Sequence, residues 1–360
     1  MNGPKHLLLT TDAVGGVWQY SLDLAAALHP LGYTVTLALL GPAPSPAQRA
    51  RANGIKDLRL IETGLDLEWL ADDTAAVLAS ERRIAQMAGD LNADLVQLHS
   101  PALVSSARYP CPVIAVLHSC VATWWAAVRS GPMPSDFGWR TDMVRKGLHR
   151  ATLTVTPSAA FAAAARRIYG VTPVAVHNGR AFAPTPRAMQ DHVFTAGRLW
   201  DEGKNVRLLD EAAKAISVPF KAAGSTRSPQ GDTVAMQALH CLGALDEDEL
   251  ARHLGARPVF ASAALYEPFG LSVLEAASAG CALVLSDIPT FRELWDGAAL
   301  FVDPRDARAF ANAINGLIEN AADRVHAGEC AQSRARRYRP AAMATRMAGL
   351  YAQAQKRVAA

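Results

Sequence analysis

Short apolar segments alternate with helical segments along almost the whole chain, and this alternation limits the fold more than any other feature. In the first half, the expected helices include residues 17–31 and residues 67–91. The strands expected around them are residues 6–11, 33–40, 58–61, 95–98, 113–118, 153–156 and 174–177. Short buried strands separated by helices favour a parallel sheet covered on both faces, the doubly wound α/β arrangement.

A polar, proline-containing stretch around Pro184 and Pro186 interrupts the pattern, which then starts again. The second set of strands is expected at residues 193–196, 218–223, 258–261 and 282–285, and the helices at residues 206–215, 250–254, 271–279 and 307–318. An amphipathic helix from residue 340 to 356 follows, with Met343, Met347, Leu350 and Tyr351 on one side. We therefore predict two Rossmann-like domains, 1–184 and 185–339, followed by a helical tail, 340–360. Two such units would place a ligand in a cleft between them.

Bulk properties exclude several classes of protein. The chain has 360 residues, 50% of them hydrophobic and 19% charged, which is typical of a folded globular protein. A net charge of +3 is too small to indicate a nucleic-acid partner. No apolar run approaches the roughly 20 residues of a membrane span, and the first residues lack a signal-peptide pattern. Five scattered cysteines predict buried thiols without a disulfide framework, and hence a cytoplasmic protein.

The strongest local signal is a pair of glutamates around a turn and a helix start. Glu267 precedes a Pro-Phe-Gly turn, and Glu275 lies about one turn into the next helix. Amides at Gly270 and Leu271 would stand at the helix N-terminus, where unpaired N–H groups and the helix dipole favour a phosphate. Glu275 would then reach ribose hydroxyls and Glu267 sugar hydroxyls. Two solvated carboxylates beside an ordinary helix are the alternative interpretation.

This stretch, from Tyr266 to Gly280, closely resembles the signature of the retaining glycosyltransferases of family four, also called glycosyl transferases group 1. Further similarities extend over most of the chain: Gly15-Gly16, His118, Gly197-Arg198-Leu199, Lys204-Asn205, and the segments 286–293 and 297–304. The resemblance implies the GT-B fold, two doubly wound domains facing a central cleft. It also implies that the tail crosses back to the first domain.

The resemblance also implies a role for each matching residue. Arg198 and Lys204 would hold the diphosphate of a nucleotide sugar, and Glu275 its ribose. Glu267 would contact the donor sugar. The remaining donor-site residues are Gly15, Gly16, Phe269, Gly270 and Leu271, and His118 would line the sugar pocket. Cations and helix amides that stabilise a departing diphosphate can replace a divalent ion, so no metal and no cofactor are expected.

Each of these residues also has a purely structural interpretation. Gly15 and Gly16 would suit any tight turn, and His118 could be a core histidine. Arg198 and Lys204 could be surface charges, and the loop between them is one residue longer than is usual in the family. The acidic run at Asp246 could suggest a metal, but its spacing to Glu249 is typical of a helix cap.

The implied reaction is transfer of a hexose-type sugar from a UDP- or GDP-sugar, with retention of configuration. We prefer front-side substitution, in which the departing phosphate oxygen takes the acceptor proton; Glu267 as a nucleophile is the weaker alternative. A sugar-nucleotide epimerase or hydrolase, or an inactive nucleotide-sugar-binding module, would carry the same motifs. A dinucleotide dehydrogenase is disfavoured because no Gly-x-Gly-x-x-Gly follows a first strand.

The acceptor, a carbohydrate, lipid-linked or small molecule, should bind mainly to the first domain. Its most unusual segment is residues 120–150, which has three tryptophans and five basic residues: Trp124, Trp125, Trp139, Arg129, Arg140, Arg145, Lys146 and Arg150. Tryptophans of this kind stack on sugars or lie at a lipid interface. Weak peripheral association with the inner membrane is therefore one expectation, and a packed subdomain with a solvated basic rim is the other.

Overall fold

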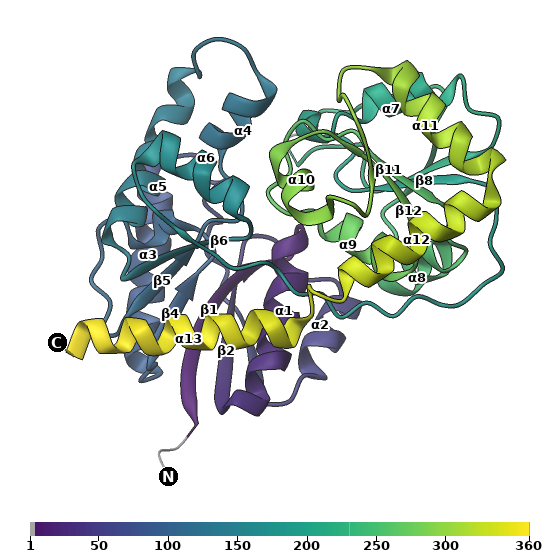
Figure 1. The fold of residues 1–360 in the computed structure, drawn as a ribbon. Coiled ribbons are helices and arrows are strands. Elements are labelled where there is room, and N and C mark those ends of the chain that lie inside the picture. The colour runs from purple at the N-terminus through teal and green to yellow at the C-terminus, as the bar shows by residue number, and fades with distance from the viewer. Residues whose placement is uncertain (1–3, 230, 360) are drawn as a thin grey trace. The chain divides into compact units, whose positions relative to one another are not determined.

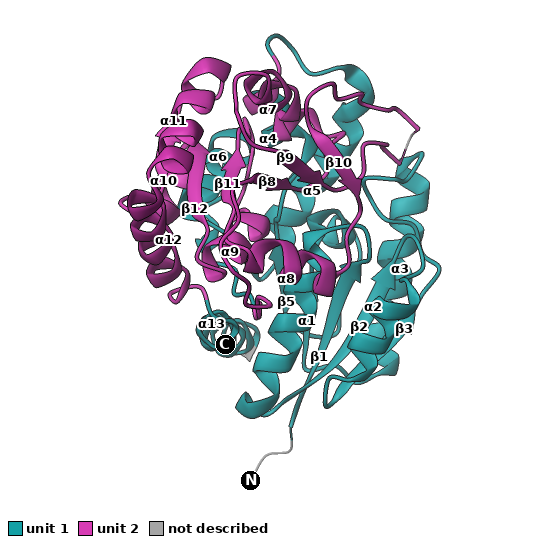
Figure 2. Cartoon of the chain, turned by 90° about the vertical axis from the view of Figure 1, so that its right-hand side faces the viewer, with its two compact units in different colours: residues 1–126, 130–180, 339–360 teal, residues 127–129, 181–338 magenta. Residues whose placement is uncertain are grey.

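The structure is a computed structural model that describes residues 4–229 and 231–359. The chain divides into two compact units (Figure 2). Unit 1 comprises residues 1–126, 130–180 and 339–360, and unit 2 comprises residues 127–129 and 181–338. Each unit has its own sheet and its own core.

Unit 1 is built on a parallel sheet with the strand order β3-β2-β1-β4-β5-β6-β7 (Figure 1). Its strands are β1 (Lys5–Asp12), β2 (Tyr33–Leu40), β3 (Leu58–Glu62), β4 (Leu95–Leu98), β5 (Val113–Val116), β6 (Leu153–Thr156) and β7 (Val174–Ala175). Its helices are α1 (Gly16–Leu28), α2 (Pro46–Asn53), α3 (Thr74–Asp90), α4 (Val121–Val128), α5 (Gly138–Arg150), α6 (Ala159–Tyr169) and α13 (Pro340–Ala359), with 3₁₀ turns at His29–Leu31, Pro101–Val104 and Ser135–Phe137.

Unit 2 repeats the design with the strand order β10-β9-β8-β11-β12-β13, again parallel. Its strands are β8 (Val193–Ala196), β9 (Phe220–Ala223), β10 (His240–Gly243), β11 (Val259–Ser262), β12 (Ala282–Ser286) and β13 (Leu300–Val302). Its helices are α7 (Val206–Ala213), α8 (Glu247–Gly255), α9 (Leu271–Ser278), α10 (Pro289–Trp295), α11 (Ala307–Glu319) and α12 (Ala321–Ala335), with a 3₁₀ turn at Glu202–Lys204. The predicted fold class, two doubly wound α/β units, is confirmed.

The central strands are buried on both faces, which explains why they are apolar at successive positions. In β4 and β5 every residue is buried, and β12 is buried along its whole length. A strand covered by helices on both sides has no solvent face on which polar residues could alternate. The two faces of the unit 2 sheet accordingly pack two separate hydrophobic clusters, one around Phe260 and one around Val259.

One predicted helix is wrong at its start. The segment 67–73 does not belong to α3; it makes a single turn, in which the amide of Ala71 donates to the carbonyl of Leu67 at 2.9 Å. The side chain of Asp73 then accepts a hydrogen bond from the amide of Ala76 and begins α3 at Thr74. A new N-cap therefore separates two stretches that share a helical spacing of apolar residues.

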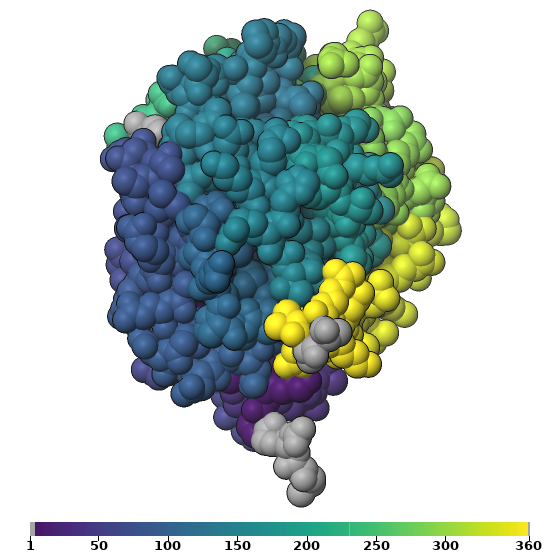
Figure 3. Space-filling view, turned by 90° about the vertical axis from the view of Figure 1, so that its left-hand side faces the viewer, coloured from purple at the N-terminus to yellow at the C-terminus, as the bar shows by residue number. Residues whose placement is uncertain are grey.

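The C-terminal helix α13 belongs to unit 1 and packs on α1, as its predicted apolar side requires. Met343, Met347 and Tyr351 are fully buried in the core cluster that also contains α1. The hydroxyl of Tyr351 donates to Gln97 Oε1 on β4 at 2.5 Å. In the space-filling view the yellow end of this helix lies beside the purple N-terminal segment (Figure 3).

The cysteine prediction is partly wrong. All five cysteines are free thiols, as expected, but only Cys281 is buried, and Cys241 is exposed. Cys241 lies on β10, the edge strand of the unit 2 sheet, where every residue is exposed or half-buried. Within residues 4–229 and 231–359, no helix is both long and apolar enough to cross a bilayer.

Candidate active site

In each unit, the residues selected from the sequence lie where the order of strands reverses. In unit 2 the chain proceeds from β8 to β9 and β10 on one side and then returns to β11 on the other side of β8. In unit 1 the same reversal occurs between β1 and β4. Loops diverge at the carboxyl ends of such strand pairs, and doubly wound sheets bind their ligands there. Arg198 and Glu267 follow β8 and β11, and Gly15 follows β1.

Arg198 projects from a turn that is held against the neighbouring loop. The amide of Gly197 donates to the carbonyl of Ala223 at 3.0 Å, and a Cβ on Gly224 would come within 1.8 Å of the Gly197 carbonyl oxygen. Only glycine at position 224 allows this close approach. The guanidinium of Arg198 donates to Asp201 at 2.8 Å and lies over the ring of Trp200. The longer loop is therefore folded into a compact turn that orients Arg198.

The guanidinium of Arg198 has an unused hydrogen-bond donor. Its Nε is buried and has no hydrogen-bond partner among the residues that the structure describes, although the side chain as a whole is 41% exposed. Buried polar atoms in folded proteins are nearly always satisfied, by protein, by water or by a ligand. An anionic ligand at the carboxyl edge of β8 would supply the acceptor.

Lys204 lies beside Glu267, so the longer loop brings it to the glutamate motif. The ammonium forms an ion pair with the Glu267 carboxylate, and the two side chains are 20% and 11% exposed. The amides of Leu265 and Tyr266 both donate to the carbonyl of Gly203, at 2.9 and 3.2 Å. Because these bonds join the loops that follow β8 and β11, the Arg198–Lys204 turn and the glutamate motif form one structure. From the sequence, it was open whether Lys204 reaches a diphosphate across the longer loop, and that contact stays a prediction.

The turn before α9 depends on Gly270. This residue has a φ of +90°, in the left-handed region that side chains disfavour. A Cβ there would also stand 3.2 Å from the ring of Phe291 and 3.3 Å from Glu267 Cγ. No side chain caps α9, so the amides of its first turn are available at the edge of the sheet. Glu275 lies one turn further and is 7% exposed.

The side chain of Phe269 holds the motif in place from the core. It is buried and packs edge-to-face on Tyr338, with ring centroids 5.7 Å apart. Any donor contact at this position would therefore come from the backbone. Asn205, which has a φ of +52°, joins the same region by donating to the carbonyls of Ala263 and Pro304.

In unit 1, Gly15 and Gly16 form the junction between β1 and α1. Gly15 is the N-cap residue, and no side chain caps the helix. The carboxylate of Asp12 accepts a hydrogen bond from the amide of Val14 at 2.9 Å, which fixes the turn. By contrast, α8 is capped by Asp246 and α11 by Asp306. The N-terminus of α1 is therefore, like that of α9, a group of amides without a side-chain acceptor at a strand reversal.

His118 belongs to a cluster of three rings, of which Tyr20 is buried and the two histidines are half-buried. Its centroid lies 4.7 Å from that of Tyr20 and 4.8 Å from that of His99, all in edge-to-face contact. Burial lowers the pKa of His118 to about 4. The pKa of His99 is well below its usual value, first because of burial and then because of the charge that His118 would carry. Both imidazoles are therefore neutral at pH 7, and His118 Nε2 has no partner in the described structure.

Sequence reasoning overlooked His99 and Gln97. Gln97 Nε2 lies 2.8 Å from His99 Nε2, and its other end accepts from Tyr351. The same signal that selected His118, a histidine directly after an apolar strand, would have selected His99 after β4. Gln97 carried no signal, because a polar residue inside a short strand is recognisable only when its partners are known.

The acidic run at Asp246 is a helix cap, as predicted. Asp246 and Glu249 exchange side-chain-to-amide hydrogen bonds at 2.8 and 3.0 Å. Within the described parts of the chain, no group of three or more His, Cys, Asp or Glu residues is arranged to hold a metal ion.

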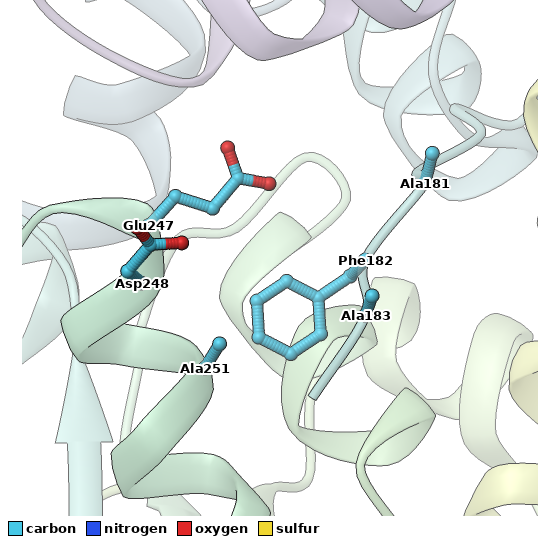
Figure 4. A pocket seen from close by; sticks show the side chains of 6 residues that line it. All are labelled: Ala181, Phe182, Ala183, Glu247, Asp248 and Ala251. Carbon is cyan, nitrogen blue, oxygen red and sulfur yellow. The ribbon is translucent and has the colours of Figure 1, made fainter. Parts of the chain in front are cut away.

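A pocket of about 380 Å³ in unit 2 lies apart from these residues. It is lined by the segment 181–183 and by Glu247, Asp248 and Ala251 of α8 (Figure 4). The ring of Phe182 and the side chain of Glu247 project toward the same space. None of the residues selected from the sequence lines it.

Two family models match the sequence, one in each half. The model described as Glycosyltransferase Family 4 matches residues 14–180, and the model described as Glycosyl transferases group 1 matches residues 190–320. Together the matched ranges include every residue selected for the candidate site. No curated protein matches the chain as a relative.

Several solved structures share the whole fold. A sucrose-phosphate synthase from Thermosynechococcus elongatus is 19% identical with a TM-score of 0.78, covering 97% of this chain and 98% of its own. The Anabaena protein HepE, solved with UDP and glucose, is 16% identical with a TM-score of 0.73, covering 97% and 100%. A glycosyltransferase from Rickettsia africae is 15% identical with a TM-score of 0.69, covering 98% and 99%. At these identities the similarity establishes the fold of the chain, and it is the GT-B arrangement.

Proposed function

We propose, since this chain belongs to the group 1 glycosyltransferases of family 4, that it moves a hexose-type sugar from a UDP- or GDP-sugar to an acceptor hydroxyl with retention of configuration. The chain is a glycosyltransferase by its family. The donor, the stereochemistry and the independence from metal are the parts that we propose. HepE, whose structure contains UDP and glucose, shares the fold and supports a nucleotide-sugar donor.

The observation that carries the proposal is the unused buried donor of Arg198 beside the Lys204–Glu267 ion pair. A leaving diphosphate gains negative charge as the glycosidic bond breaks, and fixed cations lower the energy of that state. Arg198 is oriented by Asp201, and the N-terminal amides of α9 belong to the same joined loops. These groups are in place before a ligand arrives, so little reorganisation accompanies bond breaking.

In the reaction that we propose, a bond forms between the acceptor oxygen and the anomeric carbon on the face from which the diphosphate departs. The bond from that carbon to the phosphate oxygen breaks, and this oxygen takes the acceptor proton. Glu267 would bind a hydroxyl of the donor sugar, and Glu275 the ribose. The pairing of Glu267 with Lys204 lowers the nucleophilicity of its carboxylate, which supports front-side substitution over a covalent intermediate.

Incubation with the donor alone distinguishes the proposal from its alternatives. A transferase should release little nucleotide diphosphate without an acceptor, whereas an epimerase or hydrolase would convert the donor at full rate. An inactive binding module would bind the donor and transfer nothing to a broad panel of acceptors.

A chelator tests the proposed metal independence. We expect full transfer in excess EDTA, because Arg198, Lys204 and the helix amides supply the positive charge. Complete loss of transfer that manganese or magnesium restores would contradict this part of the proposal.

A cytoplasmic location with weak contact to an anionic membrane is the remaining part of the proposal. The basic residues of the segment 120–150 give it limited support, because three of them bind backbone carbonyls. Arg140 donates to Ala71, Arg145 to Ile168 and Arg150 to Val104. We therefore expect only faint flotation with anionic liposomes, and strong salt-sensitive flotation would show that the membrane is a true partner.

A further inference from the structure

We propose that Glu68 binds a hydroxyl group of the acceptor and makes unit 1 select an uncharged, sugar-like acceptor over a phosphorylated one. This inference rests on the proposed glycosyltransferase reaction. It concerns a residue that no motif in the sequence indicates, and it gives the unidentified acceptor a chemical class.

Glu68 lies where the fold brings three separate segments of unit 1 together. It belongs to the single turn between β3 and α3, and Ser100 directly follows β4. Ser100 Oγ donates to Glu68 Oε2 at 3.3 Å. Helix α5 packs against the segment after Ser100 at van der Waals distance, because a Cβ on Gly147 would come within 1.7 Å of the Pro101 carbonyl oxygen. This close packing carries Arg140, on the same helix, toward the turn of Glu68.

The Glu68 carboxylate is incompletely satisfied. In the described structure it receives one hydrogen bond, from Ser100, and has no ion-pair partner within 4 Å. Arg140 is close enough to favour its ionised form, but the guanidinium donates to the carbonyl of Ala71 at 2.5 Å instead. The Nε of Arg140 is buried without a partner. A carboxylate with several open lone pairs therefore belongs to a turn that Arg140, with its own unused donor, contacts from α5.

Glu81 shows what a structural glutamate of the same unit is like. It is fully buried, and its two oxygens accept hydrogen bonds from Ser105 Oγ, from both the amide and Oγ of Ser106, and from the amide of Ala107. These four hydrogen bonds, from 2.7 to 3.3 Å, occupy the acceptor lone pairs of the Glu81 carboxylate. Glu68 has one such bond. Glu68 is half-buried, and partial removal of a carboxylate from water with so few partners is costly; such groups are concentrated at functional sites.

The electrostatic surroundings support the same conclusion. Burial raises the pKa of Glu68 to about 7, and the Ser100 hydrogen bond and the charge of Arg140 oppose this shift only in part. The Cys120 thiol, just after β5, is the other titratable group coupled to it, and its pKa is raised mainly by burial. A carboxyl group of this kind binds a hydroxyl in either protonation state, as acceptor or as donor.

Glu68 belongs to unit 1, the unit expected to bind the acceptor, and not to the cationic site of unit 2. Its partner Ser100 is next in sequence to His99, whose ring contacts His118. A phosphate bound beside the ionised carboxylate would place a second negative charge in a half-buried site, whereas sugar hydroxyls would satisfy both Glu68 and Arg140.

The test compares neutral and phosphorylated acceptors with wild type, Glu68→Gln and Glu68→Lys. The donor is whichever of UDP-glucose and GDP-mannose is turned over faster; the acceptors are glucose, mannose and galactose, each beside its 6-phosphate. We expect wild type to prefer the neutral sugar of the best pair by at least about tenfold, the worth of one charged hydrogen bond. Glu68→Gln should raise the acceptor KM by about tenfold with UDP or GDP affinity unchanged, and Glu68→Lys should favour the phosphorylated sugar.

Glu81→Gln is the matched control for loss of a buried carboxylate. It should lower thermal stability through its broken hydrogen bonds and leave the acceptor KM unchanged. The inference is overturned if Glu68→Gln keeps the wild-type KM, if wild type prefers the phosphates, or if it turns over donor but glycosylates none of the six sugars. Failure of both nucleotides to bind wild type would instead refute the proposed function itself.

Discussion

The two units present different chemistry at equivalent places in their sheets. At the strand reversal of unit 2, the groups are charged and close in sequence: Arg198 with Lys204, and Glu267 with Glu275. In unit 1, the groups are neutral at pH 7 or incompletely satisfied, and they come from distant segments: His99 follows β4 at the reversal, His118 follows β5, and Glu68 lies between β3 and α3. One fold therefore carries a site made of charged groups and a site made of neutral imidazoles and a half-buried carboxyl group.

This difference matches the two substrates of a glycosyltransferase. The donor leaves as an anion, and a unit that supplies fixed cations and helix amides lowers the energy of that departure. An acceptor hydroxyl is neutral, and we propose that a unit with neutral imidazoles and an open carboxyl group would bind it without attracting phosphates. We infer that the charged groups of unit 2 serve the donor and the polar groups of unit 1 serve the acceptor.

The largest expected effect comes from removing the charged groups of unit 2. Arg198→Ala and Glu275→Ala should each lower kcat/KM by at least about 10²-fold, as removal of one transition-state donor does in other enzymes. The control is Arg292→Ala. Arg292 resembles Arg198 because it is similarly exposed, pairs with Asp287, and lies over the ring of Phe301. Steady-state kinetics should show near-normal turnover for Arg292→Ala. Equal losses of kcat/KM in both arginine variants would contradict a specific role of the Arg198 charge.

A smaller effect should follow from Gly270→Ala, because two costs add there. The left-handed φ and the tight contacts with Phe291 and Glu267 should together reduce the free energy of unfolding by about 1–3 kcal/mol. Gly297→Ala is the matched control, with a φ of +73° and open space around the added methyl group. Denaturant unfolding should find the Gly270 variant less stable than the Gly297 variant. Equal stabilities would show that the close packing of the turn is unimportant.

The smallest effect concerns the pH response of unit 1. Because burial lowers the pKa of His118 from 6.5 to about 4, the neutral form is favoured in the fold. Its contribution to stability is complete above pH 6.5 and is lost as the pH falls through 4. In a histidine NMR titration, a resonance that disappears in His118→Asn should not shift between pH 8 and pH 5. A midpoint near 6.5 would contradict the neutral cluster.

The sheets were predictable from sequence because their central strands are buried on both faces and are therefore apolar throughout. Boundaries were less predictable from apolar spacing alone: that spacing predicted α8 from Leu250, whereas the predicted cap at Asp246 begins the helix at Glu247. The clearest error, helix over residues 67–73, lies in the turn that carries Glu68. Its apolar spacing is helical, but Asp73 starts a new helix. The local sequence pattern did not predict that the Glu68 carboxylate lies near Ser100, after β4, and Arg140, on α5.

The unit 2 site was predictable because its residues are contiguous and each has a recognisable local reason, such as Gly270 before a helix. The ion pair of Lys204 with Glu267 could not be predicted from the sequence, because it depends on two hydrogen bonds to the Gly203 carbonyl. The unit 1 site was only partly predictable. Gln97 pairs with Tyr351 and Ser100 pairs with Glu68, and both partners are distant in the sequence.

Calorimetric titration with UDP and with GDP tests the central claim most directly. We predict that wild type binds at least one of them with a Kd in roughly the micromolar range in the presence of EDTA, and that Arg198→Ala weakens this binding by about tenfold or more, whereas Arg292→Ala does not. Absence of binding by wild type up to about millimolar nucleotide, or equal affinity in wild type and Arg198→Ala, would contradict the assignment of the diphosphate to the cationic edge of unit 2.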